Sequence, residues 1–167
     1  MADPPGVVEF CRRMHPRLVG TLTLYCGERA VAEELAQETL MRTWNRWETV
    51  SRLESPEGWA HHVALNLARS HFRRRAAERR ARRRAGVTVE AYEGPDAADA
   101  LAVRAAVAAL PPRQRAVIAW RYYGDMSVDE TAALLGCASG TVKSLTHKAM
   151  AALRVQVIPE AEVSDGA

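Results

Sequence analysis

Apolar residues recur at intervals of three and four over most of the chain, and no segment shows the strict alternation typical of a strand. Residues 7–26 keep this helical spacing, and Gly27 directly after them is a suitable place for the helix to end. Residues 28–47 repeat the pattern and predict a second helix. Residues 48–54 have no clear period and are predicted to form a loop.

A third helix is predicted to begin at Ser55. Serine is a favourable N-cap residue, and Pro56 suits the first helical position because its missing N–H would lack a helical partner there. The helix continues through Trp59 and Leu67 into an arginine-rich stretch. Residues 85–98 contain two glycines, a proline and several acids without any period, so they are predicted to be a linker.

The second half of the chain is again predicted to be helical. Ser127 and Glu130 form a capping box, in which the serine caps a helix and the glutamate returns a hydrogen bond to the cap. Gly136 ends that short helix, and a last amphipathic helix follows after a brief turn. The helices are expected at about 101–110, 112–123, 127–135 and 139–153. The pattern therefore predicts an all-α fold.

Composition agrees with this fold class. The chain has 167 residues, enough for one domain or two small ones, and 48% of them are hydrophobic while only 6% are aromatic. No run of 18 apolar residues occurs, and residues 1–6 lack the basic and apolar regions of a signal peptide, so we expect a cytoplasmic protein without membrane contact. The three cysteines show no paired spacing and are expected to be reduced.

The net charge of +3 is distributed unevenly. Residues 61–84 contain nine arginines and one glutamate, which give net +8, whereas residues 85–100 contain four acids and no basic residue. Residues 101–158 are basic again, with net +4. Two basic zones separated by an acidic segment favour two contacts with one polyanion. For the first zone, residues 61–84, two other interpretations are open: a charge run that is simply solvated, or a basic helix that lies on a membrane surface.

The strongest motif is a helix-turn-helix made by the capped helix, the glycine-containing turn and the last helix. In such motifs the second helix enters the DNA major groove and its first turns contact base edges. Small and polar side chains occupy those turns here, and the alternative is an ordinary helical hairpin inside a core. The candidate DNA-contacting residues are Ser139, Gly140, Thr141, Lys143, Ser144, His147 and Lys148.

A second polar edge follows from the helical spacing after Ser55. Four residues fall on one side of that helix and combine hydrogen-bonding groups with phosphate-binding charge: His62, Asn66, Arg69 and Arg73. The arginine guanidinium suits phosphate because its donors form a planar fork.

The chain resembles bacterial RNA polymerase sigma factors of the extracytoplasmic-function (ECF) group in the sigma-70 family. Residues 32–40, followed by Trp44, resemble the helix that binds the polymerase clamp. Ser55-Pro56 with Trp59, then residues 63–69, resemble the −10 recognition and melting helix. Residues 110–115, 127–135 and 140–144 resemble the −35-binding helix-turn-helix. The length and the arginine-rich segment are similar to the actinobacterial SigE-like sub-family.

The resemblance implies two small helical domains joined by a flexible linker. A sigma region 2-like domain would span residues 6–84, a linker 85–98, a region 4-like domain 99–156, and a disordered acidic tail 157–167. The implied partners are core RNA polymerase, through its β′ clamp helices and β subunit, promoter DNA, and an anti-sigma factor. No cofactor, metal or small-molecule substrate is implied.

The resemblance also assigns roles to residues. Those implied to bind polymerase are Glu34, Gln37, Glu38 and Met41. The loop from Val50 to Ser55 would receive a flipped −10 base, and the residues implied to contact −10 DNA are Arg52, Ser55, Trp59, His62, Asn66, Arg69 and Arg73. The seven helix-turn-helix residues named above would contact −35 DNA. Trp44 and Trp47 are interpreted as core residues, whereas Trp59 fits either role.

The sequence departs from the family pattern at two positions in the helix-turn-helix. Ala138 stands where a capping serine is common, so Ser139 is expected to cap the last helix. Leu145 stands where many members have arginine, which removes one phosphate contact.

Two other functions remain open on the sequence alone. A stand-alone helix-turn-helix regulator would bind DNA without polymerase, but residues 28–47 would then have no role, and no dimer seam is evident. An enzyme is disfavoured because no catalytic motif occurs. His61 and His62 are adjacent, so on a helix they point about 100° apart and do not share a metal readily.

Overall fold

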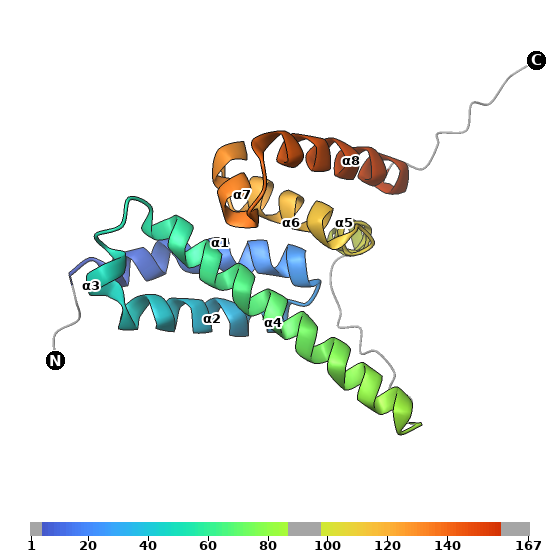
Figure 1. The fold of residues 1–167 in the computed structure, drawn as a ribbon, viewed down its shortest axis with the longest axis horizontal. Coiled ribbons are helices and arrows are strands. Elements are labelled where there is room, and N and C mark those ends of the chain that lie inside the picture. Colours follow the sequence, from blue (N-terminus) through green and yellow to red (C-terminus); the bar gives the residue numbers. More distant parts are fainter. Residues whose placement is uncertain (1–4, 87–97, 158–167) are drawn as a thin grey trace, which may run out of the picture.

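The computed structural model describes residues 5–86 and 98–157, and within these ranges every regular element is a helix (Figure 1). This confirms the predicted all-α fold. Residues 87–97 of the predicted linker and 158–167 of the predicted tail lie outside the described residues. The elements are α1 (Val7–Cys26), α2 (Arg29–Asn45), α3 (Trp47–Val50), α4 (Pro56–Arg84), α5 (Ala98–Ala108), α6 (Pro112–Ile118), η1 (Ala119–Tyr123), α7 (Val128–Leu135) and α8 (Ser139–Val157).

Most helix ends lie where the capping residues predict them. Gly27 ends α1 in the left-handed conformation, with φ of 82°, and donates its N–H to the Thr23 carbonyl. Ser55 accepts the Gly58 N–H at 3.0 Å at the start of α4. At the start of α7, Ser127 and Glu130 make both hydrogen bonds of the capping box.

Two local expectations were wrong. The segment predicted as a loop contains the short helix α3, because the Thr49 and Val50 amides find a partner in the Arg46 carbonyl. Ser139 does not cap α8, since the Val142 N–H bonds to the Ala138 carbonyl.

The helix expected at 112–123 is present, but its geometry changes at its end. Its last turn, η1, widens into a π-helical turn, so that the Gly124 N–H bonds to the Ala119 carbonyl at 3.1 Å. A Cβ atom on Gly124 would lie 2.6 Å from the Trp120 carbonyl oxygen, which explains the glycine at this position.

The first half packs α1, α2 and α4 against one another, as Figure 1 shows. Leu18 and Leu22 of α1 and Leu65 of α4 are fully buried, and Ala32 and Ala36 line the side of α2 that faces them. Their spacing of three and four residues is the pattern that predicted the helices.

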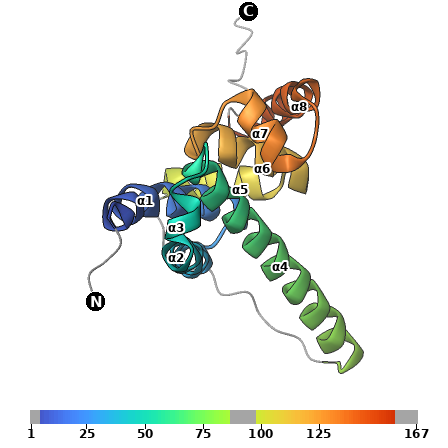
Figure 2. The ribbon, with the colours of Figure 1, turned by 60° about the vertical axis from the view of Figure 1, so that its left-hand side comes forward.

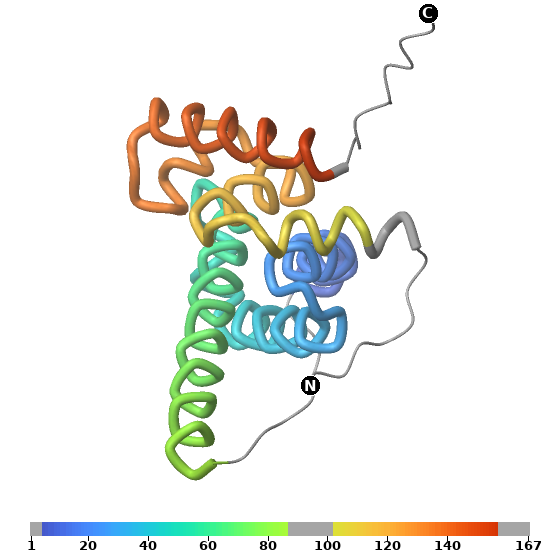
Figure 3. Tube along the Cα trace, turned by 90° about the vertical axis from the view of Figure 1, so that its right-hand side faces the viewer, coloured from blue at the N-terminus to red at the C-terminus, as the bar shows by residue number. Residues whose placement is uncertain are grey.

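The two halves of the chain meet at an aromatic seam. Trp120 of η1 is fully buried, and its ring centroid lies 5.0 Å from that of Tyr25 in α1, nearly edge to face at 71°. Phe72 of α4 lies 5.6 Å from Tyr25 on the same cluster. The Arg115 guanidinium stacks at 5.6 Å from the Tyr25 centroid and 5.4 Å from the Phe72 centroid. Figures 2 and 3 show the second half lying across α1 and the beginning of α4.

A histidine of α4 is buried near charged groups from both halves of the chain. His61 of α4 is only 2% exposed, and its Nδ1 has no hydrogen-bond partner. Burial, followed by the positive charge of Arg17 on α1, lowers the His61 pKa to about 4, although Glu130 of α7 and Glu57 of α4 oppose the shift. The imidazole is therefore neutral at pH 7.

The burial of neutral His61 predicts a stability that falls in mild acid. The folded-state pKa of about 4 lies below the ordinary value of 6.5, so the unfolded chain binds the proton more tightly. The contribution is fully present above about pH 6.5 and is lost as the pH falls toward 4. From pH 7 to pH 5 the free energy of unfolding should drop by about 2 kcal/mol through this residue.

Urea unfolding at both pH values, in the wild type and in H61Q, measures this drop. H61Q should have a flatter pH dependence, whatever its absolute stability. The matched control is H62Q, which changes the exposed neighbouring histidine and should keep the wild-type slope. An unchanged slope in H61Q would contradict the assignment.

Candidate nucleic-acid and polymerase interfaces

The polar edge predicted for the helix after Ser55 lies on α4 and is exposed along its whole length, and we call its four residues the α4 edge. His62, Asn66, Arg69 and Arg73 face outward, while residues on the other side of the helix, including Ala64, Leu65 and Ala68, are buried. Small alanines allow α4 to approach α1 and α2 closely, and this packing side fixes which residues remain outside. The four predicted residues therefore lie together on one surface of a supported helix.

The other predicted −10 residues lie at the start of this edge and are partly engaged within the chain. Ser55 is exposed but its hydroxyl caps α4. Arg52 is exposed and pairs with Glu48 at 3.2 Å. Trp59 is half-buried, which matches its ambiguous interpretation from sequence.

Arg69 and Arg73 also have neighbours that the sequence pattern did not indicate. Burial raises the pKa of the Tyr25 hydroxyl, and the charges of Arg69 and Arg115 oppose that shift. Arg73 hydrogen bonds to the Ser70 hydroxyl at 2.8 Å. Since both arginines are exposed, their guanidinium groups can still reach a ligand outside the chain.

The residues assigned to polymerase lie on the outer side of α2. Glu34, Gln37 and Met41 are exposed, whereas Glu38 is half-buried and pairs with Arg42 at 2.7 Å. We call these four predicted residues the clamp face.

A groove of about 410 Å³ opens beside the clamp face. It is lined by Cys11, Gln37, Leu40, Met41, Trp44 and Asn45. Met41 is 61% exposed, so the clamp face presents an apolar side chain to solvent beside this largely apolar groove. Trp44 lines the groove and Trp47 packs on Phe10 at 5.0 Å between ring centroids, so neither is wholly buried.

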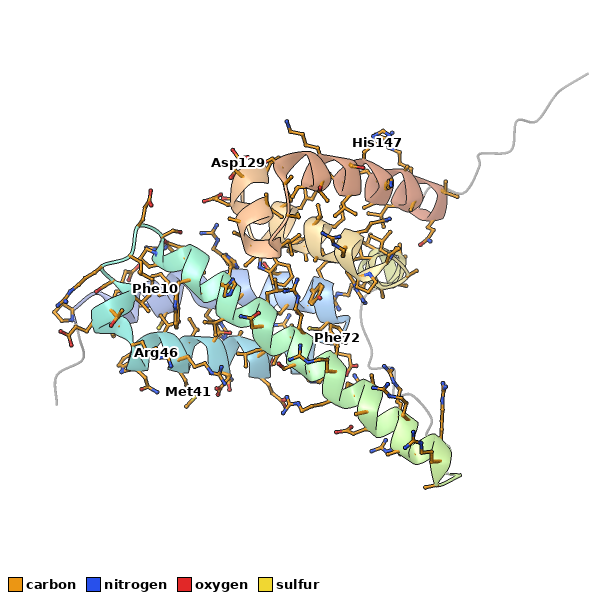
Figure 4. All side chains as sticks on the ribbon, in the orientation of Figure 1. Phe10, Met41, Arg46, Phe72, Asp129 and His147 are labelled. Carbon is orange, nitrogen blue, oxygen red and sulfur yellow. The ribbon has the colours of Figure 1, made fainter. Side chains whose placement is uncertain are left out.

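The helix-turn-helix presents the predicted residues of α8 in two environments. Gly140, Lys143, Ser144 and His147 are exposed on one side of the helix, and Lys148 is exposed beside them. Thr141 is half-buried, and Val142 on the opposite side is fully buried. We call the first four residues the α8 face. In Figure 4, His147 on α8 and Met41 on α2 lie on opposite sides of the molecule.

Ser139 has a partner that sequence analysis missed. Its hydroxyl donates to the Asp129 carboxylate at 2.5 Å, across the turn between α7 and α8. An acid in the first turn of α7 is explained locally by the helix dipole, so nothing in the pattern pointed to a contact ten residues away. Asp129 therefore belongs to the candidate site, at the N-terminus of α8.

The described part of the chain contains no cluster of three or more His, Cys, Asp or Glu suited to a metal ion. Burial raises the pKa of the Cys26 thiol to about 12, which leaves it unreactive, and none of the three cysteines forms a disulfide. None of the described helices is long and apolar enough to cross a membrane.

The geometry of these surfaces defines a class of protein. An exposed polar helix of a helix-turn-helix, a basic edge on a second helix and a separate partly apolar face are the attributes of a DNA-binding protein with a protein partner.

Comparison with known proteins gives the family. Residues 10–78 match the model of sigma-70 region 2, and residues 100–153 match that of sigma-70 region 4. The RNA polymerase sigma-E factor of Streptomyces coelicolor is 32% identical over 90% of this chain and 85% of its own length. The ECF sigma factor SigL of Mycobacterium tuberculosis is 38% identical over 77% of this chain and 76% of its own length.

A solved structure agrees with these relatives. The sigma factor RpoE of Bartonella quintana, crystallised with the anti-sigma factor NepR, has a TM-score of 0.75 and 25% identity, over 89% of this chain and 96% of that one. The chain therefore belongs to the ECF group of sigma-70 family RNA polymerase sigma factors, and it directs transcription initiation.

The capping box predicts that the Ser127 hydroxyl contributes measurably to the stability of the helix-turn-helix. S127A leaves the Glu130 amide without its partner, and loss of an N-cap serine costs about 1 kcal/mol. Urea unfolding should show this loss in S127A. The control S144A changes an exposed serine of α8 and should stay within about 0.5 kcal/mol of wild type. Equal costs for the two variants would contradict the role of the cap.

Proposed function

We propose that this sigma factor uses the clamp face to bind the β′ clamp helices of core polymerase, the α4 edge to hold the −10 strand, and the α8 face to read −35 duplex. The second half of the chain would also contact the β subunit. The observation that carries the proposal is that all three surfaces are exposed, apart from half-buried Glu38, while the opposite side of each helix is packed into the core.

Met41 and its groove support a protein partner on α2. A methionine that is 61% exposed beside an apolar groove loses favourable burial unless another surface covers it. Methionine also adapts its shape to a partner because it is unbranched and flexible. Glu34 and Gln37 provide a polar rim around this centre.

The α4 edge combines the groups that a single strand requires. Cationic side chains neutralise the backbone, and half-buried Trp59 with exposed His62 offers flat surfaces to opened bases. A melted base leaves the stack and needs a surface that receives it. We assign that surface to the loop from Val50 to Ser55, at the beginning of α4.

Gly140 supports DNA contact by the α8 face. A Cβ atom at this position would meet nothing within 4 Å, so packing within the described residues does not require a glycine. A backbone without a side chain permits close approach by a ligand. Lys143, Ser144 and His147 lie on the same side of α8 as Gly140, where they would enter the DNA major groove.

Further aspects follow from the proposed role. RNA polymerase would supply the chemistry, so the chain itself would act without catalysis, and it would act in the cytoplasm, where the polymerase is. The Bartonella relative was crystallised with an anti-sigma factor, and we propose that this chain also has such a partner. The predicted domain limits (6–84 and 99–156), with the linker 85–98 between them, would let the halves reach two promoter elements.

Reconstitution with core polymerase tests the proposal. Core polymerase and the purified protein are incubated with a fragmented GC-rich bacterial genomic library, and transcript starts are mapped. We expect reproducible starts that are absent with core alone and are lost in the double variant Q37A/E38A. The control E9A/R12A removes an exposed ion pair of α1 outside the three surfaces and should keep the starts.

Two results would contradict the proposal. One is the absence of starts together with sequence-specific duplex binding by the protein alone, which would indicate a stand-alone regulator. The other is full activity of Q37A/E38A, which would remove the clamp face from the contact.

The position of Asp129 predicts that its replacement by Asn increases the affinity for promoter DNA. Its carboxylate lies at the N-terminus of α8, where it repels approaching phosphate, and the change to Asn keeps an acceptor for the Ser139 hydroxyl. In the reconstituted holoenzyme, D129N should bind promoter duplex about two- to fivefold more tightly, as expected for one screened charge near a helix end.

The control is E9Q, which removes the same charge from α1 in the other half of the chain. It should leave the affinity unchanged in filter-binding titrations. Weaker binding by D129N would show that Asp129 assists DNA binding and would refute this prediction.

A further inference from the structure

The last turns of α4 project beyond the rest of the molecule. Figures 1, 2 and 3 show this end of the helix extending away from α1 and α2 in every view. Arg75 still contacts the body through an ion pair with Glu28. From Ala77 to Gly86 every residue is exposed. We call residues 77–86 the arm.

The arm has no support from the rest of the described chain. The hydrogen bonds found for it join its own backbone groups near the end, as from the Ala85 N–H to the Ala81 carbonyl. A helical segment of about ten residues without tertiary contacts is marginal in water. The arm contains five arginines and one acid, Glu78. A polyanion would remove the repulsion among these arginines, while their position at the helix end is favourable to the helix dipole.

The arm arginines continue the α4 edge. Eleven residues make about three helical turns, so a residue and the one eleven positions later point in nearly the same direction. Arg80 lies eleven residues after Arg69, and Arg84 lies eleven after Arg73. At 100° per residue, these four arginines fall within an arc of about 60°. Arg83 and Arg79 lie next to this stripe on one side of it, and Glu78 lies on the opposite side of the helix.

We propose that Arg80 and Arg84 bind backbone phosphates of the double-stranded DNA directly upstream of the −10 element. This inference rests on the proposed function, because it takes its direction from the α4 edge. The melted strand is assigned to the beginning of α4, so the helix runs from opened DNA toward duplex. Arg84 is about 22 Å beyond Arg69 along the axis, the length of six to seven base pairs.

The composition of the arm selects duplex phosphates over other ligands. A single-strand site needs aromatic stacking surfaces, and the arm has none. A membrane-surface helix needs a large apolar side, whereas the uncharged residues here are small. Arginine forks match phosphate oxygens without reading bases, so the contact would be independent of sequence.

Salt dependence of promoter binding tests the proposal. Holoenzyme with wild-type protein or R80Q/R84Q is titrated with a promoter from the start mapping at several KCl concentrations. Each phosphate contact contributes about 0.9 to the slope of log affinity against log salt. We expect R80Q/R84Q to lower the magnitude of that slope by about two and to weaken binding several-fold at low salt. The control R74Q/R82Q removes two arginines from other sides of the same helix and should keep the wild-type slope.

A second template locates the contact. On a promoter fragment whose duplex begins at the −10 element, wild type and R80Q/R84Q should bind equally. A wild-type slope for R80Q/R84Q, the same loss in R74Q/R82Q, or a loss that persists on the shortened fragment would each overturn the proposal. If the arm variants behave as wild type while transcript starts are normal, only this inference fails. If wild-type protein directs no starts, the proposed function fails and the arm proposal fails with it.

Discussion

The packing of Trp120 against Tyr25 is the contact on which the arrangement of the whole chain depends. Trp120 is fully buried, although it comes from the half of the chain that follows the linker. The π-helical turn of η1 carries it, and Gly124 permits the tight return of the backbone after that turn. Burial of an aromatic ring is among the largest single contributions to a core. Phe72 brings α4 into the same cluster, so one set of rings joins α1, α4 and η1.

Tertiary packing determines which surfaces are available. Because α4 turns His61, Leu65 and Ala68 inward, the α4 edge remains outside. The clamp face remains outside because α2 packs Ala32 and Ala36 into the core. The second half of the chain packs on α1 and α4 through η1 and α7, which leaves α8 on the far side with its polar residues outward. The positions of the three candidate surfaces are thus set by tertiary packing and not by three separate local patterns.

Local interactions explain which features the sequence could predict. Caps such as Ser55 and the pair Ser127 and Glu130 act over three residues, and the exposed side of α4 follows from the helical period. Both can therefore be predicted from the sequence. The seam joins Tyr25 to a residue 95 positions later, and no local rule selects that partner. The π-turn and the bond from Ser139 to Asp129 also depend on tertiary geometry, and both escaped prediction.

The length of α4 places the α4 edge and the arm on one helix. Its 29 residues form one continuous helix about 43 Å long, of which the first part is held by alanines packed against α1 and α2. The arm is helical as a continuation of that held part, since its own contacts do not stabilise it. If the beginning of α4 holds the opened strand, the direction of the axis also sets where the arm arginines meet the duplex. Strand opening and phosphate contact would then be coupled through one helix. A displacement of the DNA at one end of α4 would change the contacts at the other end. Such coupling needs no movement of the second half, because the α4 edge and the arm lie entirely within the first.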